Sequence, residues 1–351
     1  MGTLTFVGLG LDEGGRDLTL SAIETIKSSD FVYFEAYTSP FNDAVTSKIK
    51  ELTGKNVEQV SREFVEDGKQ IIEAVMRENI VLISPGDPMI ATTHTELRIR
   101  AEEIGIATRI IHNASIFTSL PGEIGLHTYK LGKTVTFTTE VNSAIPVVYQ
   151  TVHDNLIRGL HTIILLEYNY VRKSSVDPIQ ALKALTKAEE DFKQGIFTED
   201  SFMVVASRIG RSDQELSGGL IQTLLKEEFG QHPHALVIPG ELHFTEKDAL
   251  KSLLKLSDEK MIGKSMRAKR LSAIMVEKYV SNTLIALEGA RIRLRGKDVR
   301  YAELLENVEC YASDAKRFLD QGRDELAVLS IGYAEGLLDS LRFTKVLDVE
   351  W

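Results

Sequence analysis

Ile80-Val81-Leu82-Ile83-Ser84-Pro85-Gly86-Asp87-Pro88 combines a short apolar run with a loop rich in proline and glycine, and the rest of the chain is organised around it. Its apolar first half predicts a buried strand, and the Pro-Gly-Asp-Pro segment stops that strand abruptly. The two prolines restrict the backbone and Gly86 tolerates unusual angles, so a rigid loop should follow. Because open α/β sheets bind ligands at the carboxyl ends of their strands, Asp87 is a candidate ligand contact. The same pattern is also compatible with an ordinary turn between a strand and a helix.

Strands and helices alternate on both sides of this stretch. The expected strands are 3–8, 31–36, 57–60, 80–84 and 108–111, and the expected helices are 19–27, 43–52, 68–78 and 93–103. Thr93 and Glu96 have the spacing of a capping box at the start of the last helix. This alternation predicts a parallel, helix-covered sheet in an α/β domain of residues 1–112.

A second glycine loop, Gly8-Leu-Gly-Leu11, follows the first expected strand. A dinucleotide-binding fingerprint would need glycine where Glu13 stands, with a helix opening directly. These glycines therefore predict a close approach of the backbone to a ligand without a pyrophosphate cradle.

Residues 113–255 form a second expected α/β domain, which opens with a glycine-punctuated helical segment at 113–126. Its expected strands are 133–138, 162–167, 202–206 and 235–238, and its helices are 145–156, 178–193 and 220–229. Ligand pockets favour domain interfaces, so the cleft between the two domains is the expected site.

From residue 256 the glycine and strand signals fade, and the sequence predicts a three-helix bundle over 256–351. One helix is expected within 261–294, and Asp320-Gln-Gly322 marks the turn between the other two. The last two helices are expected to bury Ala302, Leu305, Val308, Ala312, Ala315 and Leu319, and Leu326, Leu329, Ala334, Leu337 and Leu341. At one helix end Arg291, Arg293, Arg295, Lys297 and Arg300 form a basic cluster, which is either a solvated turn or a docking surface.

Composition narrows the class of protein. The chain has 351 residues and a formal net charge of −10, which disfavours broad binding to nucleic acid or to anionic membranes. A single cysteine excludes an internal disulfide framework, and no apolar run is long enough to span a bilayer. Charged residues within the first twenty exclude a signal peptide there. These features predict a cytoplasmic protein.

Several motifs resemble one known family. They are the loops at 8–11, 38–40 and 84–88, the segment Ala91-Thr-Thr-His-Thr-Glu-Leu-Arg-Ile-Arg100, Gly125-Leu-His-Thr-Tyr129, Gly159-Leu-His-Thr162 and His232-Pro-His-Ala-Leu-Val-Ile-Pro-Gly240. In this order the sequence is similar to the diphthine synthases, methyltransferases of the tetrapyrrole methylase superfamily, from residue 1 to about 254. The helical extension resembles a small archaeal family of unknown function, through Asp324-Glu-Leu-Ala327 and Tyr333-Ala-Glu-Gly-Leu-Leu-Asp339.

The resemblance implies an α/β, two-domain tetrapyrrole-methylase-like fold followed by an all-α bundle. It also implies a homodimer that holds S-adenosyl-L-methionine in the interdomain cleft. The implied acceptor is translation elongation factor 2, on which the amine of a 3-amino-3-carboxypropyl-histidine is methylated repeatedly to form diphthine. Carried over by position, the cofactor contacts are Leu11, Asp87, Ile90, Ser115, Ile116, Leu166, Ile209 and His234.

No catalytic base is evident from the sequence. The attacking amine must be neutral, so a carboxylate or histidine that accepts its proton is conceivable. Glu167, Glu123 and His127 are the candidates for the acceptor side, against the simpler interpretation that each is a surface or packing residue. Glu167 stands where the resemblance leads us to expect aspartate. His232, His234 and His243 have no carboxylate at metal-ligand spacing, so we expect no metal.

Two other functions fit the sequence less well. One is a corrinoid, porphyrin or RNA ribose methylase of the same superfamily, which would need a cavity for a macrocycle or nucleic acid. The other is a non-catalytic assembly protein that binds the cofactor and works through its helical bundle.

Overall fold

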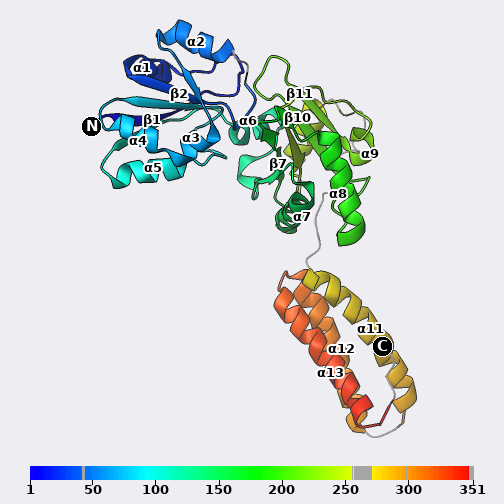
Figure 1. Ribbon diagram of the computed structural model, residues 1–351. Coiled ribbons are helices and arrows are strands. Elements are labelled where there is room, and N and C mark those ends of the chain that lie inside the picture. Colours follow the sequence, from blue (N-terminus) through cyan, green and yellow to red (C-terminus); the bar gives the residue numbers. More distant parts are fainter. Residues whose placement is uncertain (42–43, 255, 257–270, 297–298, 348–351) are drawn as a thin grey trace. The chain divides into compact units, whose positions relative to one another are not determined.

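The computed structural model describes residues 1–41, 44–254, 256, 271–296 and 299–347. The chain divides into two compact units, Met1–Ala268 and Lys269–Trp351. The first unit contains two α/β lobes, and the described residues of the second form three helices (Figure 1).

The N-terminal lobe is built on a five-stranded parallel sheet, as the alternation of strands and helices predicted. In spatial order its strands are β3 (Glu58–Val60), β2 (Phe31–Glu35), β4 (Ile80–Ser84), β1 (Thr3–Gly8) and β5 (Ala107–Ile111). Every residue of β4 is buried, because helices cover both faces of the sheet.

Alternate residues of β4 divide between the two faces. Ile80 and Leu82 pack against α3 (Arg62–Asp67), α4 (Lys69–Val75) and α5 (His94–Glu103). Val81 and Ile83 pack on the opposite side, against α1 (Leu20–Ser28) and α2 (Ala44–Thr53) (Figure 1). Burying each of these side chains stabilises the fold by roughly 1.5–3 kcal/mol, which fixes the end of β4 and the loop after it.

The predicted capping box at the start of α5 is wrong. Thr93 has φ −98° and ψ 5°, outside the extended conformation of a capping residue, and its side chain makes no capping hydrogen bond. The neighbouring side chains hold the loop instead. Thr92 Oγ1 donates to the carbonyl of Pro88 at 2.9 Å, and His94 Nδ1 donates to the same carbonyl at 2.8 Å.

The C-terminal lobe is built on a mixed sheet. In spatial order its strands are β11 (Glu215–Leu220), β10 (Phe202–Ser207), β12 (His234–Ile238), β7 (Thr162–Leu166) and β6 (Val135–Phe137). Only the β6–β7 pair is parallel. Helices α6 (Ile116–Ile124) and α10 (Phe244–Leu253) pack on one face, and α7 (Val141–Ile157) and α8 (Pro178–Phe192) pack on the other.

The sequence misassigned one part of this lobe. A helix was expected at 220–229, but β11 extends to Leu220 and α9 covers only Ile221–Leu224. The Ser217-Gly218-Gly219 segment has low strand propensity, so β11 was missed, and its antiparallel pairing with β10 overrides that preference. The α10 helix and the small hairpin of β8 (Tyr168–Asn169) and β9 (Ser174–Ser175) were also not predicted.

The second unit contains α11 (Leu271–Leu294), α12 (Val299–Asp320) and α13 (Asp324–Phe343). The stripe predicted on α12 is largely buried, although Ala302 is exposed. On α13 the prediction was partly wrong, because Ala327, Ile331, Ala334, Leu338 and Leu341 are buried and Leu329 is 55% exposed. Apolar residues occupy more than one face of this helix, and the face through Ala327, Ile331 and Ala334 is the one that packs in the core of the bundle. Residues 261–270, where the first helix was expected to begin, lie outside the described residues.

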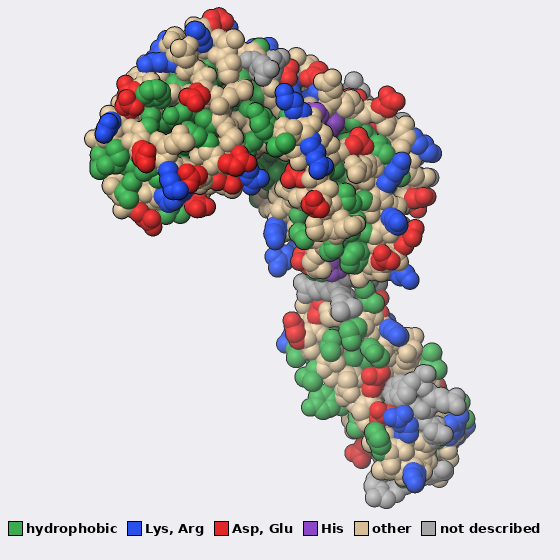
Figure 2. All heavy atoms as spheres, in the orientation of Figure 1, with side chains coloured by type: hydrophobic (Ala, Val, Ile, Leu, Met, Phe, Trp, Pro, Cys, Tyr) green, Lys and Arg blue, Asp and Glu red, His purple; other side chains and the backbone are tan. Residues whose placement is uncertain are grey.

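Acidic and basic side chains are interspersed over both α/β lobes on the face shown in Figure 2. Within the described residues, no helix is both long enough and apolar enough to cross a membrane.

Candidate functional site

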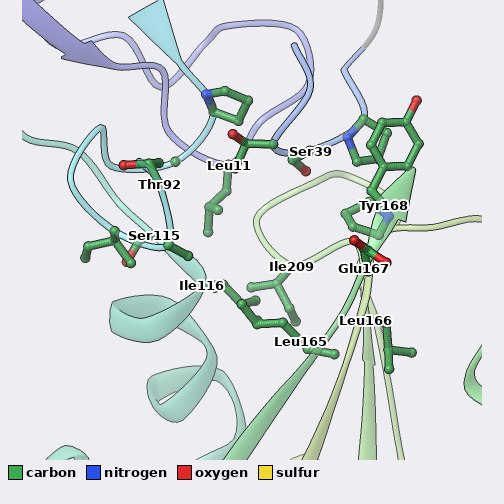
Figure 3. Close-up of a pocket in the computed structure, with 18 of the residues that line it drawn as sticks. Leu11, Ser39, Thr92, Ser115, Ile116, Leu165, Leu166, Glu167, Tyr168 and Ile209 are labelled. Carbon is green, nitrogen blue, oxygen red and sulfur yellow. The ribbon is translucent and has the colours of Figure 1, made fainter. Parts of the chain in front are cut away.

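A pocket of about 410 Å³ lies between the two α/β lobes and is lined by residues of both (Figure 3). Its volume is in the range of sites for small organic ligands. In Figure 3, Leu11 from the N-terminal lobe faces the same space as Ile116 and Ile209 from the C-terminal lobe. The expected interdomain cleft is therefore present in the fold.

Two glycine loops form the N-terminal wall of the pocket and touch each other through their backbones. The N–H of Gly86 donates to the carbonyl of Gly10 at 2.8 Å, and the N–H of Gly10 donates to that of Gly86 at 3.1 Å. A Cβ atom on Gly8 would lie 2.5 Å from the carbonyl oxygen of Gly86. The loops after β1 and β4 therefore meet so closely that Gly8 can carry no side chain.

Asp87 ties the Pro-Gly-Asp-Pro loop to the start of the C-terminal lobe. Its Oδ2 accepts from His112 Nδ1 at 2.7 Å and from the N–H of Asn113 at 3.2 Å, and its Oδ1 accepts from the N–H of Met89 at 2.9 Å. The side chain is 5% exposed and lines the pocket. The carboxylate thus holds two segments of the pocket wall together.

His234 lines the pocket and carries an unpaired polar atom. Its Nε2–H donates to the carbonyl of Phe229 at 3.1 Å, whereas its buried Nδ1 has no partner among the described residues. Burial lowers the pKa of His234, so the ring is neutral at pH 7 and Nδ1 can only accept a hydrogen bond. A bound hydroxyl or amino group would satisfy this atom.

Arg211 connects the two lobes at the pocket. From the C-terminal lobe, its Nη1 donates to Glu13 Oε2 at 2.9 Å and its Nη2 donates to the carbonyl of Pro40 at 2.7 Å. Its guanidinium also lies 5.9 Å from the ring centroid of Phe41. Only 8% of the side chain is exposed, so these contacts fix the 37–41 loop against the other lobe.

Two buried side chains, Glu35 and His94, hold residues of the N-terminal wall of the pocket in place. Thr38 donates its N–H to Glu35 Oε2 at 3.2 Å and its hydroxyl to the same carboxyl group at 2.9 Å, and Thr38 itself lines the pocket. Burial raises the pKa of Glu35 to about 8 and lowers that of His94. Sequence reasoning missed this pair, although His94 lies in one of the motifs that carry the family resemblance.

All eight positions carried over as cofactor contacts line this one pocket: Leu11, Asp87, Ile90, Ser115, Ile116, Leu166, Ile209 and His234. The loops after β1 and β4 bring the first three together, the junction and the start of α6 bring the next two, and strand ends of the C-terminal lobe bring the rest. Sequence reasoning did not single out Arg62, Tyr168 or Arg211, which also line the pocket.

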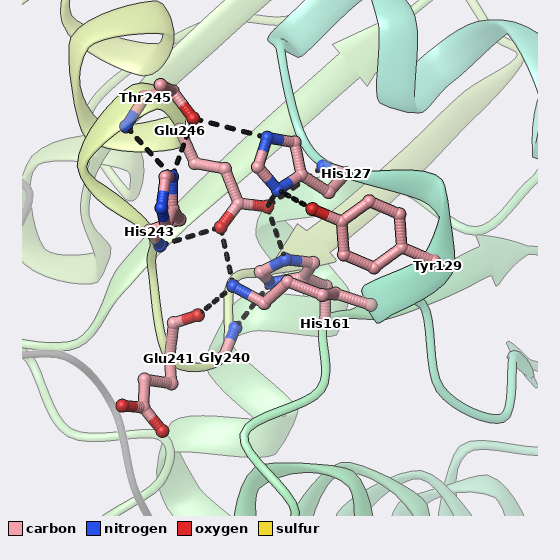
Figure 4. Close-up of polar contacts among 9 residues, drawn as sticks. His127, Tyr129, His161, Gly240, Glu241, His243, Thr245 and Glu246 are labelled. Carbon is pink, nitrogen blue, oxygen red and sulfur yellow. Dashed lines mark hydrogen bonds and ion pairs between the residues drawn. The ribbon is translucent and has the colours of Figure 1, made fainter.

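The three candidates for the acceptor side lie in different places. Glu167 lines the pocket, and its Oε2 accepts from the N–H of Thr139 at 2.6 Å and from the Thr139 hydroxyl at 2.9 Å. Glu123 is exposed, accepts from Gln214 Nε2 at 2.7 Å, and is not among the residues lining the pocket. His127 is not among them either, and it belongs to a separate polar cluster (Figure 4).

Glu246, on α10, is the centre of that cluster. It accepts from His161 Nε2 at 2.9 Å, from Lys130 Nζ at 2.5 Å and from the N–H of His127 at 2.8 Å (Figure 4). Burial alone would raise the pKa of Glu246, but the hydrogen bonds from Lys130 and from backbone N–H groups outweigh it and lower the pKa to about 2. The cluster therefore joins α10 to His161, which directly precedes β7, and to the 127–130 segment, which is a structural role.

The histidines do not assemble a metal site within the described residues, where no group of three or more histidine, cysteine or acidic side chains could hold a metal ion. His232 lies against the ring of Tyr168, with centroids 5.4 Å apart, and His243 caps α10.

Comparisons with known proteins agree with this architecture. Residues 3–225 match the family described as Tetrapyrrole (Corrin/Porphyrin) Methylases, and residues 278–347 match a family of unknown function, DUF357. A diphthine synthase of Methanocaldococcus jannaschii is 38% identical over 255 residues, which cover 71% of this chain and 98% of that protein. A diphthine synthase of Methanothermobacter thermautotrophicus is 35% identical over 70% of this chain and 94% of that protein.

Solved structures give the same result. A crystal structure of diphthine synthase superposes with a TM-score of 0.63 at 31% identity, covering 72% of this chain and 96% of that chain. The match to the curated relatives extends over nearly their whole length, and it favours this branch over macrocycle or RNA methylases and over a non-catalytic protein. The chain therefore belongs to the diphthine synthase family of tetrapyrrole methylases and is an S-adenosylmethionine-dependent methyltransferase of diphthamide biosynthesis.

Proposed function

We propose that this methyltransferase binds S-adenosyl-L-methionine in the interlobe pocket and methylates the amine of the 3-amino-3-carboxypropyl-histidine on translation elongation factor 2. The observation that carries the proposal is that one pocket is lined by all eight positions expected to contact the cofactor. The names of the similar proteins support the acceptor.

The residues present fit the cofactor. The buried Nδ1 of His234 lacks a donor that an amino or hydroxyl group of a nucleoside would supply. Gly86 brings backbone to the pocket wall with a φ of 65°, and Gly8 and Gly10 pack so tightly that an added Cβ would lie 2.5 and 2.3 Å from neighbouring atoms. Leu11, Ile116 and Ile209 offer apolar surface that would exclude water from the reacting atoms.

When bound, S-adenosylmethionine supplies a sulfonium methyl group. The chain's own contribution is to hold donor and acceptor in line, at about 3–3.5 Å, in a site closed to water. The rigid loops after β1 and β4, fixed by Asp87 and by their backbone bridge, are suited to this positioning.

Cofactor binding can be tested by calorimetric titration with S-adenosylhomocysteine. We expect Ile116→Trp, which fills the pocket, to weaken binding by at least about tenfold, because the ligand loses its space. The matched control is Ile99→Trp on the exposed face of α5, where 51% of the side chain is accessible. Equal affinities for the two variants would contradict the assignment of the pocket.

Acceptor identity can be tested by mass analysis of elongation factor 2 that carries the precursor histidine. Incubation with the enzyme and cofactor should add one or more methyl groups to that histidine derivative alone. A product without added methyl groups would contradict the proposed acceptor.

We infer in addition that the enzyme is a homodimer, as the family resemblance implies, and that it is cytoplasmic, as the sequence features predict. Light scattering of the purified chain would give twice the monomer mass of 39.1 kDa. Cell fractionation would test the compartment.

The helical unit is proposed to dock on elongation factor 2 or on ribosomal RNA. Arg291 of its basic cluster already pairs with Glu288 and Glu309, while Arg295 is exposed. Lys297 lies outside the described residues. Deleting residues 257–351 should weaken acceptor binding, and Arg295→Glu should do so in part. Unchanged acceptor affinity after the deletion would exclude this role.

A further inference from the structure

Several residues that line the pocket lie outside the positions assigned to the cofactor. They include Tyr37, Arg62 and Thr93 from the N-terminal lobe and Glu167 and Tyr168 from the C-terminal lobe. Among these five, Arg62 is positively charged and Glu167 negatively charged, and each is supplied by a different lobe. Such a site is suited to a small zwitterion.

Most charged groups that line the pocket are already engaged. Both oxygens of Asp87 accept hydrogen bonds. Arg208 donates to the carbonyls of Phe229, Gln231 and Asp213. Arg211 is occupied with Glu13 and Pro40. These groups therefore have little capacity left for a charged ligand.

Arg62 and Glu167 retain that capacity. Arg62 Nε donates to Glu66 Oε1 at 2.7 Å, and its two Nη groups have no partner in the described part of the chain. Glu167 Oε2 accepts both bonds from Thr139, which leaves Oε1 without a partner there. Thr139 thus orients the carboxylate and leaves one oxygen available at the pocket.

The two charges also lie within electrostatic range of each other. The hydrogen bond to Glu66 does most to raise the pKa of Arg62, and the negative charge of Glu167 adds to the shift. Tyr37 acts on the same group. Arg62 is 60% exposed, so a group carried by another protein can reach its guanidinium.

We propose that Arg62 and Glu167 form the acceptor end of the pocket and recognise an α-amino acid head group, with Arg62 on its carboxylate and Glu167 on its amine. This inference rests on the proposed function, in which the methylated amine and a carboxylate share one carbon atom. Guanidinium groups match carboxylates through paired N–H donors, and a carboxylate is the natural partner of an ammonium group.

The two residues then act at different stages. Arg62 holds the acceptor before and during the reaction, so its contribution is to binding. In the transfer itself, the electron pair of the neutral amine forms the new N–C bond while the S–C bond breaks and its electrons remain on sulfur, which gives S-adenosylhomocysteine. Nitrogen gains positive charge in this step, and Glu167 stabilises that charge as it develops. The proton of the starting ammonium leaves to water before the attack.

The test is steady-state methylation of elongation factor 2 carrying the precursor histidine, together with calorimetry of S-adenosylhomocysteine. We expect Arg62→Ala to raise the acceptor KM by about tenfold with little change in kcat, and Arg62→Lys to recover part of the loss. We expect Glu167→Gln to lower kcat by about tenfold or more. Each variant should bind S-adenosylhomocysteine within about twofold of the wild type, because neither residue belongs to the cofactor positions.

Two exposed residues that do not line the pocket provide matched controls. Arg77→Ala and Glu190→Gln should leave kcat, KM and cofactor affinity unchanged. The inference is overturned if Arg62→Ala and Glu167→Gln keep the acceptor kcat and KM within about twofold of the wild type, or if they weaken cofactor binding as much as acceptor turnover. If the wild type transfers no methyl group to this protein, the proposed function fails, and the inference fails with it. Normal acceptor turnover by both variants would refute the inference alone.

Discussion

Glu35 Oε1 lies 3.9 Å from His94 Nε2, and both side chains are completely buried under the pocket. His94 Nδ1 donates to the carbonyl of Pro88, so its proton is on that nitrogen and Nε2 is bare. Glu35 accepts a hydrogen bond from Thr38, and His94 donates one to Pro88 in the loop that contains Asp87. One buried pair therefore supports two loops of the pocket wall, one after β2 and one after β4.

The protonation of Glu35 should appear in the pH dependence of stability. Burial raises its pKa from 4.5 to about 8 in the folded chain, so the folded state keeps a proton that the unfolded state loses. The stability that it contributes is present in full below pH 4.5 and is lost as the pH rises to about 8, with a slope of up to about 1.4 kcal/mol per pH unit. Glu35→Gln, which stays neutral, should lack this contribution. Urea unfolding of both proteins from pH 5 to 9 measures this contribution. The same pH dependence of the unfolding free energy in both proteins would contradict the prediction.

A side chain at Gly10 should disturb the pocket, whereas one at Gly105 should not. Both glycines have positive φ, 84° and 79°, so Ala costs each about 1–2 kcal/mol of stability through backbone strain. At Gly10 the added Cβ would also lie 2.3 Å from Asp17 Cβ, whereas nothing lies within 4 Å at Gly105. Asp17 orients the N–H groups of Leu11 and Asp12, so the clash displaces the loop that lines the site. We expect Gly10→Ala to weaken S-adenosylhomocysteine binding by tenfold or more, about 1.4 kcal/mol, in calorimetry. Binding equally weakened in Gly105→Ala would count against a local effect.

The contact of Arg211 with Glu13 should couple the two lobes measurably. Arg211→Met removes both the ion pair and the hydrogen bond to Pro40, and it should destabilise the chain by about 2–3 kcal/mol. Because Glu13 is 45% exposed, its share is expected to be small, and a double-mutant cycle with Glu13→Gln should give a coupling energy of about 1 kcal/mol or less. Cofactor affinity should fall in Arg211→Met, since the 37–41 loop loses its anchor. Unchanged affinity and stability would show that the loop is held by other contacts.

Glu246 should contribute to the stability of the fold and not to cofactor binding in the pocket. Replacing it with Gln leaves Lys130 and His161 without their anionic partner, at a cost of about 3 kcal/mol. The pKa of Glu246 is lowered to about 2, so its contribution is present above pH 4.5 and is lost as the pH falls toward 2. Between pH 7 and pH 3, the free energy of unfolding should fall less for Glu246→Gln than for the wild type. Glu241→Gln is the exposed neighbouring control. S-adenosylhomocysteine binding at pH 7 should be unaffected, and a loss of affinity would indicate that the cluster communicates with the pocket.

Short sequence patterns predicted most of the strands, the helices around them and the loops after β1 and β4, because these features depend on local residue preferences. Apolar runs such as Ile80–Ile83 specify buried strands, and glycine and proline limit the backbone wherever they stand. The sequence was less informative where tertiary pairing overrides local preference, as in β11, and where a helix has two apolar faces, as in α13.

Which distant side chains come close to one another depends on the tertiary structure. Arg211 and Glu13 are 198 residues apart in the chain, and no local pattern relates them. The same is true of Glu35 with His94, and of Arg62 and Glu167, which line one pocket because the ends of strands and helices converge on the edges of two sheets. The ionisation of Glu35 and Glu246 differs for a related reason. Both are buried, and only the hydrogen-bond partners supplied by distant segments decide whether the carboxyl group keeps its proton or loses it.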